Sequence, residues 1–289
     1  MFGRSFKNPL ILVGLFLLLI IVFSVILIPM LSPYQWSDVD GTMKYQAPSS
    51  EHWFGTTRLG QDLFVNIWQG GRISLALALI GVIPYTIIGT LLGILSGAGN
   101  KKVDFVVSQF MTFIHAFPLL PLIMILGIGL RQIEMEPFQI LFLSVFIYSV
   151  FSTPSLFKVI RAETMRIHSE EYMKATNILG LNRWAKTRNH IFPNLASYVI
   201  ISSLQFMAHI LIVELLLFFI GVGYSTSANQ SRPPSWGNLI PNIRGDNAFK
   251  EYYWTWFFPI SAIALTTVSL RLLSEGLRVA FDPKAERAN

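Results

Sequence analysis

Six long apolar segments alternate with polar connections along the 289-residue chain. Each is long enough for a helix to cross a bilayer, which takes roughly 20 residues. The segments are 10–31, 73–98, 105–130, 138–157, 195–222 and 252–270. They lack the alternation of barrel strands, and a membrane-spanning helix satisfies its own backbone hydrogen bonds. The pattern therefore predicts an all-α integral membrane protein with six transmembrane helices.

The first apolar segment follows Arg4 and Lys7, as the apolar core of a secretory signal would. It is longer than such a core, and the sequence I-P-M-L-S at 28–32 offers no small-x-small cleavage site. We therefore predict that residues 10–31 are retained as the first span.

Six spans place both termini on one side of the membrane. With the termini in the cytoplasm, Lys and Arg favour the cytoplasmic side by about two to one, as the positive-inside rule requires. We predict a first unit of residues 1–72, with one transmembrane helix and a long outer loop. A five-helix core follows at 73–289 and carries a cytoplasmic loop at 165–194.

The most polar part of that loop, residues 169–194, predicts two short helices. Ser169 can cap the first helix, and Glu170 and Glu171 complement its N-terminal dipole. Gly180 suits the left-handed position that ends a helix. One face of this helix is expected to carry Tyr172, Ala175, Thr176 and Leu179.

The second short helix is predicted to begin at Asn182, whose side chain can cap it. It is basic through Arg183, Lys186 and Arg188, and Pro193 is expected to stop it. Two short helices between membrane spans are typical of a docking element.

The outer loop at 32–72 ends in a glycine-rich stretch. Residues 62–68 are predicted to form a short interfacial helix flanked by glycines, within a lid over the spans. In the second span, the spacing of Gly81, Gly89, Gly93 and Gly97 indicates close helix packing.

The third span contains His115, Pro118 and Pro121. The prolines predict a kink, and His115 is interpreted as a satisfied interior histidine. Glu214 is the acidic residue inside the fifth apolar segment, which makes it a functional candidate because a buried carboxylate is costly. His209 lies too far round the same helix to pair with it directly.

Several kinds of chemistry find no support in the sequence. The chain has no cysteine, its five histidines lack metal-ligand spacing, and no nucleophile elbow occurs. The stretch 180–187 is not a phosphate-binding loop, because Ala185 stands where glycine is needed. We therefore expect no catalytic site, metal or cofactor on this chain. The net charge of +6 is assigned to cytoplasmic loops and not to nucleic-acid binding.

Four motifs, in the right order, carry a family resemblance. The loop resembles the "EAA" loop of ABC-importer permeases through Glu171, Ala175, Gly180 and Pro193, with Thr176 in place of a second alanine. The outer stretch G-T-T-R-L-G-Q-D at 55–62 is similar to G-T-D-x-x-G-R-D, with Thr57 and Gln61 as departures. The stretches P-S-W-G at 234–237 and E-G-L-R-V-A-F-D-P at 275–283 complete the set. Together they resemble the second, C-type permease subunit of the oligopeptide, dipeptide and nickel branch.

The resemblance implies a non-catalytic subunit of the bacterial cytoplasmic membrane. Its expected partners are a second homologous permease, two ATPase subunits that hold ATP and Mg²⁺, an extracytoplasmic substrate-binding protein and membrane lipid. Glu214 is expected to contact the second permease or, with His209, the substrate path. The residues expected to couple to the ATPase are Glu170, Glu171, Tyr172, Ala175, Thr176, Gly180 and Pro193.

Alternatives remain open at this point. The cargo could be oligopeptides or dipeptides, which the lack of metal ligands favours, or nickel or a metal–chelator complex. A less favoured hypothesis is an ion-coupled secondary transporter that uses Glu214 as the carrier. An intramembrane enzyme lacks a catalytic pair.

Overall fold

The computed structural model describes residues 8–132, 135–178, 181–219, 233–240 and 248–281, and most of these are helical. Within these ranges, β pairing is limited to one isolated bridge between Thr56 and Asp62. The helices in chain order are α2 (Pro9–Leu31), α3 (Leu63–Gly97), α4 (Lys101–His115), α5 (Leu119–Gln132), α6 (Pro137–Ser169), α7 (Glu171–Ile178), α8 (Arg183–Lys186), the π-helical turn η1 (Thr187–Ile191), α9 (Phe192–Phe219), α10 (Ala248–Glu251) and α11 (Trp254–Phe281).

Among the described residues, five helices are long and apolar enough to cross a membrane: α2, α3, α6, α9 with the turns before it, and α11. The pair α4 and α5 passes the same test together but is bent by 68°. The break lies at Pro118, which lacks a backbone N–H and disfavours a helical residue before it. Counting the bent pair as one span gives the six spans predicted, with the kink where the prolines placed it.

The helix α3 corrects the prediction of a separate interfacial helix at 62–68. Asp62 caps α3 by accepting a hydrogen bond from the backbone N–H of Val65 at 2.9 Å, and the helix then continues for 35 residues. Gly70 and Gly71 do not interrupt it. A Cβ on Gly71 would lie 2.5 Å from the side chain of Val25, so this glycine serves close packing. The predicted division between residues 72 and 73 falls inside this continuous helix.

The two longest helices, α3 and α6, pack along most of their length. A Cβ on Gly93 would lie 2.7 Å from Cβ of Ile160, and one on Gly97 would lie 2.6 Å from Cβ of Thr164. Small residues let helices approach closely where lipid gives no hydrophobic drive for association. The glycine spacing in α3 is therefore a packing pattern, as predicted.

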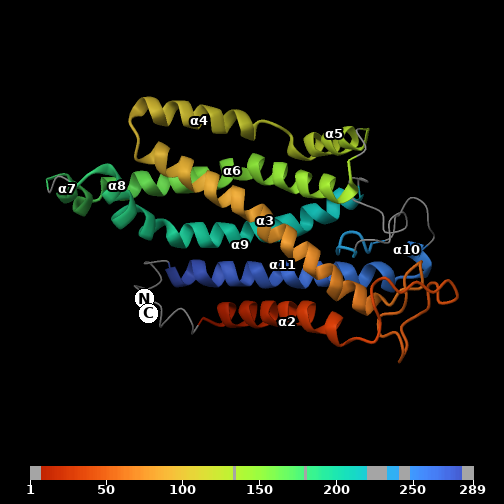
Figure 1. Cartoon of the computed structure of the whole chain (residues 1–289). Helices are drawn as coiled ribbons and strands as arrows, with labels where there is room; N and C mark the ends of the chain where they lie inside the picture. Colours follow the sequence, from red (N-terminus) through yellow and green to blue (C-terminus); the bar gives the residue numbers. More distant parts are fainter. Residues whose placement is uncertain (1–7, 133–134, 179–180, 220–232, 241–247, 282–289) are drawn as a thin grey trace.

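Figure 1 shows the helices lying side by side between two ends of the molecule. The start of α2, the end of α11, and α7 and α8 lie at one end, and the loop at 32–62 lies at the other with α10. The described ends of α2 and α11 therefore lie at the same end of the molecule as α7 and α8.

The loop before α3 is built on two glycines with positive φ. Gly55 and Gly60 both have φ of +75°, a conformation that a residue with a Cβ rarely adopts. Thr56 ties the loop together by donating to the backbone oxygen of Met43 at 2.5 Å and accepting from the N–H of Gln46 at 2.8 Å. The motif at 55–62 therefore forms an ordered loop that ends in the cap of α3.

Candidate functional site

The polar loop between α6 and α9 begins later than its sequence predicts. Helix α6 continues to Ser169, whose hydroxyl donates to the backbone oxygen of Arg166 at 2.7 Å, so the prediction that Ser169 caps the next helix is wrong. Glu170 has extended backbone angles and forms the corner between α6 and α7. Its carboxylate pairs with Arg166 at 3.0 Å, which orients this corner.

The short helix α7 has one face turned into the protein and one turned outward. Met173 and Thr176 are buried, and the hydroxyl of Thr176 donates to the backbone oxygen of Met173 at 2.7 Å. Glu171 and Tyr172 are exposed. The single face expected to include both Tyr172 and Thr176 is therefore not formed. The side chain of Ala175 and all of Gly180 lie outside the described residues.

The second helical part of the loop runs directly into α9. Asn182 caps α8 as predicted, since its Oδ1 accepts from the N–H of Ala185 at 2.7 Å. Pro193 does not stop the helix. It is the second residue of α9, and the turn before it is π-helical, with the N–H of Phe192 donating to the oxygen of Thr187. The wider turn makes room for the proline ring, which would collide with an α-helical carbonyl.

Glu214 is fully buried on α9, where it meets groups of α3 and of the segment 233–240. Its Oε1 accepts from the hydroxyl of Ser74 on α3 at 2.9 Å and from the N–H of Gly237 at 3.4 Å. The N–H of Trp236 donates to the same Ser74 hydroxyl at 3.0 Å, and its indole donates to the oxygen of Ile67 at 2.7 Å. Glu214 therefore holds the segment 233–240 against α3 and α9.

The other residue assigned to a substrate path, His209, lines a partly open cavity of about 440 Å³. The structure thus separates the two residues that the sequence grouped: Glu214 anchors a loop, whereas His209 borders open space. The cavity size falls within the roughly 300–1,000 Å³ typical of small-ligand sites. Its walls come from α3, α4, α5, α6 and α9, with Phe117 at the break between α4 and α5.

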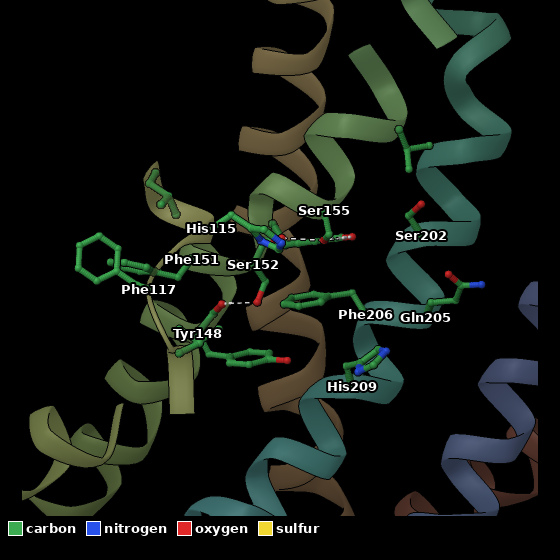
Figure 2. A pocket seen from close by; sticks show the side chains of 14 residues that line it. His115, Phe117, Tyr148, Phe151, Ser152, Ser155, Ser202, Gln205, Phe206 and His209 are labelled. Atoms are coloured by element: carbon green, nitrogen blue, oxygen red, sulfur yellow. Dashed lines mark hydrogen bonds between the residues drawn. The ribbon is translucent and has the colours of Figure 1, made fainter. Parts of the chain in front are cut away.

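His115 also lines this cavity, which corrects its interpretation as a satisfied interior histidine. Its side chain is exposed and has no hydrogen-bond partner in the described part of the chain. Figure 2 shows Ser202, Gln205, Phe206 and His209 along α9, across the cavity from His115 and the labelled residues of α6.

A stack of three rings forms one wall of the cavity. Phe206 lies between Tyr85 of α3, with ring centroids 3.8 Å apart, and Tyr148 of α6, with centroids 5.7 Å apart. Sequence inspection missed these residues because each is an ordinary aromatic in an apolar helix. Only the packing of three helices brings them together.

The lining of the cavity suits a neutral ligand. None of its 14 residues is Asp, Glu, Lys or Arg. Among the described residues, no group of three or more His, Cys, Asp or Glu could hold a metal ion. The arrangement offers hydroxyl, amide and imidazole groups beside aromatic surfaces.

Comparisons with known proteins define the class. Residues 89–287 match the family model described as the binding-protein-dependent transport system inner membrane component. Residues 1–48 match the N-terminal transmembrane domain of oligopeptide transport permease C. The chain therefore belongs to the family of inner-membrane permease components of binding-protein-dependent transport systems, and the second match confirms the resemblance to C-type permeases. It is a multi-pass protein of the bacterial inner membrane.

Relatives match along nearly the whole chain. A protein of Brucella suis biovar 1 that is named as a peptide permease is 30% identical over 98% of this chain and 90% of its own. The oligopeptide transport system permease protein of Bacillus subtilis is 27% identical over 98% of this chain and 88% of its own. The glutathione transport system permease protein of Pectobacterium atrosepticum is 29% identical over 94% and 85%.

Proposed function

We propose that this chain is the C-type permease subunit of an ATP-driven importer of oligopeptides or dipeptides. The observation that carries the proposal is the full-length similarity to proteins named as peptide and oligopeptide permeases. The neutral cavity between the helices supports it, because a peptide backbone is itself a neutral series of donors and acceptors.

In this proposal the chain has no catalytic role, and ATP and Mg²⁺ are held by two partner ATPases. A second permease completes the path, and an extracytoplasmic binding protein delivers the peptide. The loop at 165–194 lies in the cytoplasm and meets an ATPase through its exposed side, which includes Glu171 and Tyr172. Because Met173 and Thr176 on the inner side of α7 are buried and α7 contacts α6, a push on α7 would reach α6.

Deletion of the gene tests the cargo. Uptake of a labelled tripeptide should fall by more than tenfold in the deletion strain and return with the plasmid-borne gene. Uptake of radioactive nickel, supplied free and with a chelator, should stay unchanged. Unchanged peptide uptake in a strain with no other peptide permease, or loss of nickel uptake alone, would contradict the proposed cargo.

The coupling role is tested at Gly180, which we expect to end the coupling helix. Gly180→Leu should leave membrane insertion intact but separate ATP hydrolysis from transport, so that peptide moved per ATP falls severalfold. Gly129→Leu is the matched control, because a Cβ at Gly129 would meet nothing within 4 Å. Equal peptide-to-ATP ratios in the two variants would contradict the role of Gly180.

A further inference from the structure

The cavity between α3, α4, α6 and α9 holds polar groups that the fold leaves unpaired. Ser202, Gln205 and His209 of α9 and His115 of α4 all line it, and none has a hydrogen-bond partner among the described residues. His115 and His209 are exposed, and Ser202 and Gln205 are half-buried, so their polar atoms can be reached from the cavity. These four groups are available to a ligand.

The apolar part of the cavity lining is the ring stack of Tyr85, Phe206 and Tyr148. Tyr85 is further fixed by its hydroxyl, which lies 3.3 Å from the hydroxyl of Ser155. Aromatic surfaces accept apolar and aromatic side chains without a directional requirement. A ligand with alternating amide groups and side chains would therefore match both parts of the lining.

The charge of the cavity wall determines whether it favours cationic, anionic or neutral ligands. A fixed charge in the wall would favour cargo of the opposite sign and reject the other, because like charges repel strongly in a low dielectric. The 14 lining residues include no carboxylate, ammonium or guanidinium group, and Arg271 of α11, outside the lining, interacts electrostatically with His209. Hydroxyl and carboxamide groups both donate and accept, so they can exchange hydrogen bonds with successive peptide units whatever the side chains are.

We propose that this cavity is a transient binding site for the peptide backbone, with no Asp, Glu, Lys or Arg in its lining to select cargo side chains by charge. Gln205, Ser202 and the two histidines bond the peptide amides, and the Tyr85–Phe206–Tyr148 stack receives apolar side chains. This inference rests on the proposed function and adds the residues that touch the cargo.

The test introduces a charge into the neutral wall. In the complete importer, with its binding protein unchanged, uptake of labelled Ala-Lys-Ala and Ala-Glu-Ala is compared for Gln205→Glu and Gln205→Lys. Gln205→Glu should raise the lysyl-to-glutamyl uptake ratio about fivefold, equivalent to ~1 kcal/mol, and Gln205→Lys should lower it by a similar factor. Gln139→Glu, at an exposed position near the start of α6 and outside the cavity, should leave the ratio unchanged.

A structural disturbance would slow uptake of both peptides equally and leave the uptake ratio unchanged. Unchanged ratios in both Gln205 variants would therefore overturn the inference. If the wild-type protein still imports both peptides, the proposed function stands. Wild-type protein that imports neither peptide would overturn both. A second measurement leaves Gln205 intact: p-benzoylphenylalanine at position 151 should crosslink to the labelled peptide during turnover. The same group at Phe16, exposed on α2, should not. Crosslinks from position 151 to lipid or the partner permease alone would also overturn the inference.

Discussion

Single glycines determine how closely α3 approaches α6. At Gly93 the space for a Cβ is already filled by Ile160, and the backbone nitrogen of Arg161 lies 3.2 Å from the same point. At Gly129 on α5 the corresponding space is open. Replacing each glycine with alanine therefore separates the effect of helix packing on stability from the effect of helix propensity.

Gly93→Ala should lower the free energy of unfolding by about 1–3 kcal/mol, because the methyl group forces α3 away from α6. Gly129→Ala should be neutral or stabilising by up to ~1 kcal/mol, since alanine favours a helix more than glycine does. Thermal denaturation of both variants in detergent measures the difference. Equal midpoints would show that Gly93 is not a packing contact.

Glu214 offers a second comparison at the scale of one residue. Glu214→Gln keeps an oxygen that can accept from Ser74 and Gly237, so the variant should fold and retain ATP-driven transport. Glu214→Ala removes the acceptor of buried donors that include the Ser74 hydroxyl and the Gly237 N–H, at a cost of about 1–3 kcal/mol.

The measurements are thermal stability and ATP-driven uptake for both Glu214 variants. A Glu214→Gln protein that folds normally but does not transport would instead favour the ion-carrier hypothesis for this residue. Equal stability of the two variants would contradict the anchoring role.

At the scale of elements, the sequence predicted the spans well because length and apolar content are local properties. It misjudged where helices continue beyond the membrane: α6 extends to Ser169, and α3 begins at Leu63. Two adjacent glycines such as Gly70 and Gly71 are typical of a helix break, but α3 continues through them because they allow close packing.

The cavity could not be predicted from the sequence, because its lining residues come together only after five helices have packed. Figure 1 shows how far apart in the chain those elements are.

One ion pair joins α4 to α6 at the end of the molecule where α7 and α8 lie. Arg161 donates to both carboxylate oxygens of Asp104, at 2.5 and 2.6 Å, and Asp104 also accepts from the hydroxyl of Ser96 on α3. The charged side chains are partly exposed, at 32% for Arg161 and 21% for Asp104, so solvent weakens the pair. Three helices meet at this carboxylate.

A double-mutant cycle of Asp104→Asn and Arg161→Gln should give a coupling energy of about 1 kcal/mol. Arg161→Lys should recover only part of it, because lysine cannot form the two parallel hydrogen bonds. The free energies of unfolding of the single and double variants provide the measurement. Additive effects would show that the pair does not hold α4 to α6.

At the scale of the whole molecule, the exposed surfaces agree with a subunit of a membrane assembly. Large apolar side chains are exposed along α2, α4 and α5, including Phe16, Phe105 and Phe113. Lipid or a partner subunit can cover such surfaces, whereas water cannot do so favourably. The family to which the chain belongs is named for dependence on a binding protein, which agrees with a subunit that works together with other chains.

The most direct test is peptide uptake by proteoliposomes that contain this chain, its partner permease and the ATPases, with the binding protein outside. The account predicts that labelled tripeptide accumulates only when this chain, the binding protein and hydrolysable ATP are all present. Accumulation driven by an ion gradient without the ATPases would contradict it, and so would ATP-driven accumulation of equal size without this chain.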